Sequence, residues 1–327
     1  MANRRGRHTP RSRVGLDRAL GALPPPASSA PTPPPPSALA TELAPDSAPA
    51  LSAPTPPPLI PLKDNIPTGR VPVVTAILVA INFIVYLLSI RHGGSLISGP
   101  TAAEELKLGA IPYALTHPGV HCAEVARLTV LGPTSPQLLC NTALLAVNHI
   151  PTENPLPAWE TVFTGMFSHA SILHIAGNMI FLWIFGDNVE NAIGPVRYVA
   201  FYLAGGIAAL ALQVAVSPDS TAPTLGASGA IAAVLGGYIV LFPRARILTL
   251  VFIVLIVTVV ELPTWVMLGV WFAEQAVFGA AGLTDPAGGG GGVAYFAHVG
   301  GFIFGLLSIR LLAKRARQQP LPPRPAY

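Results

Sequence analysis

The stretch GASGAIAAVLGGYIVLF, residues 226–242, is an apolar run that contains no charge and begins with a serine among small residues. Such a run predicts a helix buried in a membrane bundle, and the composition of the whole chain agrees. The 327 residues are 51% hydrophobic and 10% charged, and the mean hydropathy is +0.57. Water-soluble domains of this length rarely have such values, so the sequence predicts an integral membrane protein.

Six apolar segments, found by working outward from this run, predict an all-α bundle of six transmembrane helices. A helix needs about 20 apolar residues to cross a hydrocarbon core of about 30 Å, and shorter helices are accepted inside a bundle. The run at 247–260 is too short for a seventh span, because at 1.5 Å per residue it would be about 21 Å long. The predicted helices are Val71–Ile90, Ser171–Gly186, Val196–Val216, Ser228–Phe242, Leu262–Phe278 and Val293–Leu312.

Basic residues give these helices a direction. Six spans place the arginine-rich N-terminal tail, the basic connections and the basic C-terminus on one side, which predicts cytoplasmic termini in the cell membrane. The net charge of +4 is explained by these groups, so nucleic acid is not an expected partner. The basic residues that fall on this side after the tail are Arg197, Arg244, Arg246, Arg310, Lys314, Arg315 and Arg317.

Composition divides the chain into three parts. Residues 1–65 are predicted to be a proline-rich, disordered cytoplasmic tail, because the first 70 residues hold nearly half of the 36 prolines. Arginines near the start resemble a signal sequence, but no apolar segment follows before Leu59, so cleavage is not expected. A partner-binding role for the proline tracts is the alternative. Residues 66–312 form the six-helix domain, with a long extracytoplasmic first loop at 91–158, and residues 313–327 form a short basic cytoplasmic tail.

The only two cysteines, Cys122 and Cys140, lie in this first loop. An even number of cysteines in an oxidising compartment favours a disulfide. The alternative is a metal site that adds His117 and His121, although no repeated ligand spacing supports it.

Unusual polar residues lie near the beginnings of the second, fourth and sixth predicted helices, which all start at the outer face. They are His169, His174 and Asn178, then Ser228, and then His298. Each has a structural interpretation when taken alone: Ser228 as a helix N-cap, and the others as hydrogen-bond partners between helices. Their shared depth in three helices instead predicts a catalytic site, because polar groups in a membrane bundle usually face its interior.

The chemistry of these residues suggests their roles. A serine hydroxyl becomes a nucleophile when a base takes its proton, so Ser228 is the expected nucleophile and His298 the expected base. Side chains of His174 and Asn178, with the Ser228 backbone N–H, are the expected donors to an oxyanion. This chemistry needs no metal or organic cofactor.

Glycines permit the close approach that the site requires. Gly229 on the fourth helix, and Gly301 and Gly305 at G-x-x-x-G spacing on the sixth, predict that these two helices pack closely. Gly226 leaves the backbone beside Ser228 open to a substrate carbonyl.

With these motifs the chain closely resembles the bacterial members of the rhomboid family of intramembrane serine proteases, over about Ile66–Leu312. The resemblance implies a six-helix bundle, a Ser228–His298 dyad, an oxyanion site with His174 and Asn178, and a supporting role for His169. It also implies substrates that are single-span membrane proteins. The chain departs from many members at Glu160, where arginine commonly follows the tryptophan. The matching motifs are H-x-x-x-x-H-x-x-x-N (His169, His174, Asn178), G-x-S-G (Gly226, Ser228, Gly229) and A-H-x-x-G (Ala297, His298, Gly301).

The sequence therefore predicts an intramembrane serine endopeptidase whose partners are single-span substrates and the lipid bilayer. A non-proteolytic binder of membrane helices is the main alternative. A transporter is disfavoured, since the chain has no visible inverted repeat or buried acidic pair. Asp187 and Glu190 are predicted to end the second helix, where Arg197 would pair with one of them.

Overall fold

The structure is a computed structural model that describes residues 59–313, apart from 68, 126–127, 130–131, 134–136, 142–155, 254–255 and 285–292. The expected N-terminal tail lies outside the described residues as far as position 58, and so does the C-terminal tail from position 314. Residues 59–64, which lie before the boundary expected at residue 66, form a strand.

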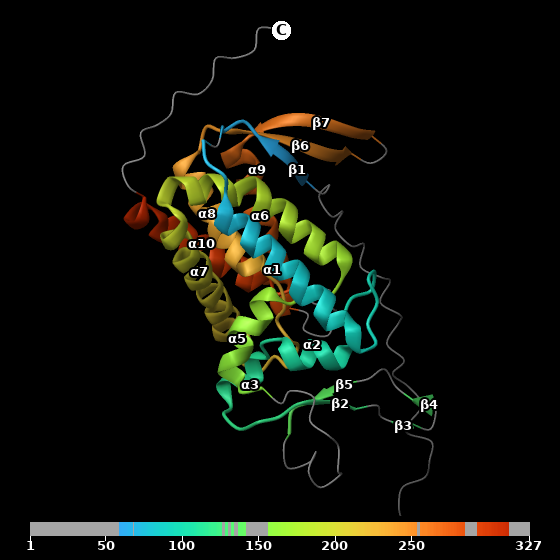
Figure 1. Ribbon diagram of the computed structural model, residues 1–327. Helices are drawn as coiled ribbons and strands as arrows, with labels where there is room; N and C mark the ends of the chain where they lie inside the picture. Colours follow the sequence, from blue (N-terminus) through green and yellow to red (C-terminus); the bar gives the residue numbers. More distant parts are fainter. Residues whose placement is uncertain are drawn as a thin grey trace, which may run out of the picture. The chain divides into compact units, whose positions relative to one another are not determined.

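Among the described residues, six apolar helices form the bundle, as predicted (Figure 1). Five are long and apolar enough to cross a membrane, and the shorter apolar helix is α8. Its residues from Gly229 to Tyr238 are all buried, so α8 is the core of the bundle. With 14 residues, α8 is about 21 Å long, shorter than a hydrocarbon core. The helices are α1 (Val73–Ser89), α6 (Ile172–Ile193), α7 (Pro195–Val216), α8 (Ser228–Leu241), α9 (Thr264–Thr284) and α10 (Tyr295–Leu312).

A three-stranded antiparallel sheet lies at one end of the bundle, and we call this the sheet end (Figure 1). Its strands are β1 (Leu59–Asp64), β6 (Arg246–Ile253) and β7 (Ile256–Pro263), in the order β1-β6-β7. The apolar run at 247–260 is therefore a hairpin and not a span, which agrees with six helices. The expectation of a purely helical fold missed this sheet. In a short, fully apolar run, the spacing of polar and apolar residues does not distinguish a strand from a buried helix.

Polar contacts join two pairs of helices at the sheet end. Glu190 of α6 accepts hydrogen bonds from the backbone N–H groups of Val74 (3.0 Å) and Thr75 (2.8 Å), at the start of α1. A carboxylate is favourable there, because the free N–H groups of a helix start carry partial positive charge. Arg197, at the start of α7, donates to the carbonyl of Leu312 at the end of α10 (3.0 Å). The expected pairing of Arg197 with Asp187 or Glu190 is thus wrong for Glu190, which caps α1 instead.

The strand β1 is joined to the same end by one side chain. The Asp64 carboxylate accepts hydrogen bonds from Asn188 of α6 (2.7 Å) and from the hydroxyl of Tyr238 near the end of α8. The ends of α6, α8 and α10 therefore meet at the sheet end, and their beginnings lie at the opposite end, as alternating helices require.

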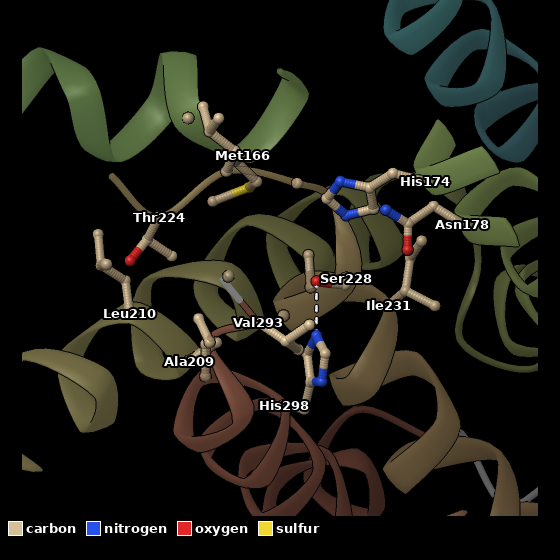
Figure 2. A pocket seen from close by; sticks show the side chains of 18 of the residues that line it. Met166, His174, Asn178, Ala209, Leu210, Thr224, Ser228, Ile231, Val293 and His298 are labelled. Carbon is tan, nitrogen blue, oxygen red and sulfur yellow. Dashed lines mark hydrogen bonds between the residues drawn. The ribbon is translucent and has the colours of Figure 1, made fainter. Parts of the chain in front are cut away.

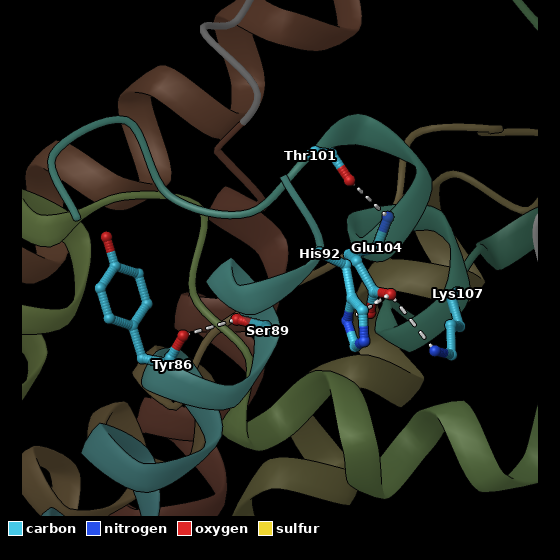
Figure 3. A network of polar contacts seen from close by, with 6 residues as sticks. All are labelled: Tyr86, Ser89, His92, Thr101, Glu104 and Lys107. Carbon is cyan, nitrogen blue, oxygen red and sulfur yellow. Dashed lines mark hydrogen bonds and ion pairs between the residues drawn. The ribbon is translucent and has the colours of Figure 1, made fainter. Parts of the chain in front are cut away.

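The first loop has a structure of its own beyond α1. After the short helix η1 (Ile90–His92) it contains α2 (Ala102–Leu108), α3 (Pro112–Thr116), the small strand pairs β2 (Ala123–Val125) with β5 (Gln137–Leu139) and β3 (Leu128–Thr129) with β4 (Gly132–Pro133), and α5 (Ala158–Phe167). Glu104 contacts both His92 and Lys107 at 3.3 Å, and its N–H is capped by the Thr101 hydroxyl (Figure 3). The contact with His92 joins α2 to η1, which directly follows α1.

Cys122 and Cys140 form a disulfide, as expected. Cys122 is fully buried in a small cluster with Leu106, Ile111 and Ala114. The alternative metal site is therefore wrong, because both thiols are consumed. His117 instead stacks on Tyr113 with ring centroids 4.1 Å apart.

Candidate active site

Ser228 is the first residue of α8, and its hydroxyl faces His298 (Figure 2). The Ser228 Oγ and the His298 Nε2 are 2.8 Å apart, within hydrogen-bonding distance. The N-cap of α8 is Ala227, with no side-chain cap, so the interpretation of Ser228 as an N-cap is wrong. Its hydroxyl is directed to the imidazole of another helix instead.

Glycines bring α8 and α10 close enough for this contact. A Cβ added to Gly301 would overlap the carbonyl oxygen of Gly229, and one added to Gly305 would overlap that of Ala233. Gly236 of α8 is equally close to the carbonyl oxygen of Phe302. Gly229 itself packs mainly against α7, where its Cβ would lie 2.6 Å from that of Ala209. The helix packing expected from the small residues is thus observed, with α7 as an additional neighbour.

Gly226 is required by both its conformation and its surroundings. Its φ of +116° lies in the region that favours glycine. A Cβ at this position would lie 2.8 Å from His174 Nε2 and 3.5 Å from Ser228 Oγ. The imidazole of His174 therefore lies beside the serine because residue 226 has no side chain.

The beginning of α6 supplies the other polar groups. The Ser171 hydroxyl caps the helix by accepting from the His174 N–H (3.2 Å), and Asn178 follows one turn later on the same face. Asn178 Nδ2 is buried, and it has no hydrogen-bond partner in the part of the chain that the structure describes. His169 is fully buried, and its ring meets the His174 ring edge-on at 5.0 Å. The structure thus brings all the predicted polar residues together.

A cavity of about 680 Å³ opens beside Ser228. Its wall combines the polar groups of the site with apolar side chains from α5, α7, α8 and α9, among them Met166, Leu210, Ile231 and Trp271. Figure 2 shows His174, Asn178, Ser228 and His298 on the same cavity. A peptide segment that entered it would meet the serine hydroxyl, the imidazole and the amide together.

Two features of the site were not predicted from the sequence. Gln275 of α9 approaches His298 Nδ1 to 2.7 Å, and Trp271 packs near the same ring at 5.9 Å. The first loop also holds the segment before Ser228, because Ala110 and Thr224 exchange backbone hydrogen bonds of 3.1 and 2.8 Å. A signal for Gln275 was available, since an amide in an apolar span is unusual.

Comparison with known proteins places part of this chain in one domain family. The rhomboid domain model matches residues 157–315. Rhomboid protein 1, mitochondrial, from Saccharomyces cerevisiae is 31% identical over 163 residues, 49% of this chain and 43% of that protein. Presenilin-associated rhomboid-like protein, mitochondrial, from Mus musculus is 32% identical over 145 residues, 43% of this chain and 34% of that protein. RHOMBOID-like protein 12, mitochondrial, from Arabidopsis thaliana is 36% identical over 104 residues, 27% of this chain and 31% of that protein. The matched regions thus span less than half of each relative.

The fold and the site define a multi-pass membrane protein whose helical bundle holds a serine and a histidine in contact. Residues 157–315 of this chain match a rhomboid domain, and the relatives that it resembles carry rhomboid names. These relatives are named as mitochondrial proteins, so they support the family and not the bacterial type or the cell membrane expected from the sequence.

Proposed function

We propose that this protein is an intramembrane serine endopeptidase, with Ser228 as nucleophile and His298 as general base and acid. The observation that carries the proposal is the 2.8 Å contact between Ser228 Oγ and His298 Nε2, made by two different helices inside the bundle. A half-buried serine and histidine at this distance are placed as proton transfer from the hydroxyl requires.

The reaction begins when Ser228 Oγ gives its proton to His298 Nε2 and attacks the carbonyl carbon of the scissile peptide bond. Negative charge then develops on the carbonyl oxygen. The donors placed to receive it are Asn178 Nδ2, which is buried without another partner among the described residues, the His174 ring, and the Ser228 N–H in the first turn of α8.

Collapse of this intermediate breaks the C–N bond, and His298 gives its proton to the departing amine. An ester on Ser228 remains. A water molecule then loses a proton to His298 and adds to the ester carbonyl. The bond between the carbonyl carbon and Oγ breaks, the acid is released, and the proton returns to Ser228.

The proposed substrates are single-span membrane proteins cut in or next to their helix. The site lies at the beginning of the short helix α8, whose 14 residues are fewer than those of the five helices long enough to cross a membrane, so we expect a substrate segment to reach it within the bundle. A helical backbone hides its carbonyl groups in its own hydrogen bonds, so small or helix-destabilising residues would favour unwinding into the cavity.

The proposed orientation has the sheet end and both termini in the cytoplasm and the site opening to the opposite side. The basic side chains at the sheet end include Arg197 and Arg246, which support this direction by the positive-inside rule. Cysteine accessibility on intact cells or organelles tests it: a thiol introduced beside the site should react with an impermeant reagent, and one in the β6–β7 hairpin should not.

The alternative is a non-proteolytic binder of membrane helices that uses the same cavity. Reconstituted protein with a labelled single-span substrate separates the two, when wild type is compared with Ser228→Ala. Ser308→Ala is a matched control, because its hydroxyl bonds the carbonyl of Phe304 within α10 (2.6 Å). We expect cleavage by the wild type and the Ser308 variant, and none by the Ser228 variant. Equal cleavage by Ser228→Ala would overturn the proposal, and binding without cleavage by the wild type would support the alternative.

A further inference from the structure

Gln275 contacts one ring nitrogen of His298, and Ser228 contacts the other. Its side-chain oxygen, Oε1, lies 2.7 Å from His298 Nδ1, and Ser228 Oγ lies 2.8 Å from Nε2 of the same ring. The imidazole is therefore held between α8 and α9, with one polar contact on each nitrogen. We infer that Gln275 is a positioning residue that keeps His298 in the tautomer and orientation needed by a base. This inference rests on the proposed function.

The chemical argument follows from hydrogen-bond roles. A neutral imidazole has one nitrogen that donates and one that accepts. An amide oxygen can only accept, so a bond to Gln275 Oε1 places the proton on Nδ1. Nε2 then carries the lone pair, and it can accept the hydroxyl proton of Ser228. Without Gln275 the proton can occupy Nε2 instead, and that tautomer cannot act as the base.

The helix α9 is well placed to hold this contact. Trp271 lies one turn before Gln275 on the same helix face, and its ring is 5.9 Å from that of His298 and 6.0 Å from that of Phe302. Phe272 stacks on Phe302 at 4.7 Å. These aromatic contacts fix α9 against α10, so the amide and the imidazole keep their register.

An amide in this position differs from a carboxylate in its charge. A carboxylate inside the bundle would be costly to bury, and it would hold a proton on the ring by its negative charge. The polar or aromatic neighbours of His298 given by the structure are Ser228 from α8 and Gln275 and Trp271 from α9. The other titratable groups on the cavity wall are His174 of α6 and Glu105 of α2. Gln275 thus orients the ring while leaving it neutral.

Three variants of reconstituted protein test the inference: Gln275→Leu, Gln275→Glu and, as a control, Glu274→Gln at the neighbouring position of α9. Leucine suits a membrane helix and has a similar size, and thermal unfolding checks that each variant is folded. We expect Gln275→Leu to lower kcat by about 10- to 100-fold with KM within about 2-fold, the usual range for groups that orient a catalytic or ligating side chain. Gln275→Glu should move the acid limb of the pH–rate profile to higher pH. The control should match the wild type.

A spectroscopic measurement keeps the test independent of cleavage. Nitrogen-15 spectra of histidine-labelled protein, with His298 assigned by its loss in His298→Gln, report which ring nitrogen carries the proton. We expect the Nδ1–H tautomer in the wild type and in Ser228→Ala, and a mixture or the Nε2–H form in Gln275→Leu. Unchanged tautomer, kcat and pH profile in the Gln275 variants would overturn the inference. If the wild type cleaves normally in that case, the proposed function stands.

Discussion

Gly301 offers the most demanding test of the helix packing that creates the site. A Cβ at Gly301 would overlap the carbonyl oxygen of Gly229 on α8, and this backbone atom cannot rotate away. Carbon–oxygen contacts need about 3.3 Å, so Gly301→Ala would force α8 and α10 apart by about 1 Å. Ser228 directly precedes Gly229, and His298 lies one turn before Gly301. The 2.8 Å contact between them would therefore open beyond hydrogen-bonding distance.

The expected effects are large for a single methyl group. A displacement of about 1 Å in a catalytic pair lowers the rate by about 100-fold. Overpacking of the helix contact lowers the free energy of unfolding by about 1 to 3 kcal/mol. Cleavage of a labelled substrate in proteoliposomes measures the first effect, and thermal unfolding in detergent measures the second.

Gly269→Ala is the matched control for this experiment. Gly269 is also a glycine inside a membrane helix, but a Cβ there meets no atom within 4 Å. Activity should be unchanged, and the free energy of unfolding should stay the same or rise by up to about 1 kcal/mol through helix propensity. The reasoning is refuted if Gly301→Ala behaves like Gly269→Ala in both assays.

Three further predictions concern stability. Replacing Cys122 and Cys140 by serine opens a loop with a sequence separation of 18, which should destabilise the first loop by about 3 kcal/mol; unchanged resistance of this loop to limited proteolysis would contradict it. Glu190→Ala leaves buried N–H groups at the start of α1 unpaired, as at Thr75, and should lower the free energy of unfolding by about 2 kcal/mol or more; an unshifted thermal midpoint would count against that role. Burial, with a smaller contribution from the neighbouring histidine ring, lowers the pKa of His169 to about 3. As the pH falls below about 6.5, His169 takes up a proton in the unfolded chain but stays neutral in the folded protein, so the free energy of unfolding should decrease toward pH 3. His169→Gln should weaken this pH dependence when unfolding is measured between about pH 6.5 and pH 3.

Much of the bundle could be predicted from the sequence, because the membrane restricts the choices. Long apolar runs must become helices, and polar side chains in them must face the interior. This is why Ser228, His174 and His298 could be assigned to one site from three separate segments. The close contact of α8 with α10 also followed from Gly301 and Gly305.

The remaining features depend on contacts between segments that are distant in the sequence. The hairpin of β6 and β7 is apolar on both faces, so the spacing of its apolar residues does not distinguish it from a helix. Glu190 had two available partners, a side chain and a helix start, and only the packing of α1 beside α6 decides between them. Gln275 was visible as a polar residue in a span, but its contact with His298 depends on the rotation of α9.

The most direct test of the central claim is the reaction of Ser228 with a fluorophosphonate probe, located by mass spectrometry of the digested protein. An activated serine should form an adduct at Ser228 in the wild type and none at Ser308. The adduct should be lost in His298→Ala, because no other base is in contact with the hydroxyl among the described residues. An unmodified Ser228 in folded protein, or equal labelling in His298→Ala, would contradict the account.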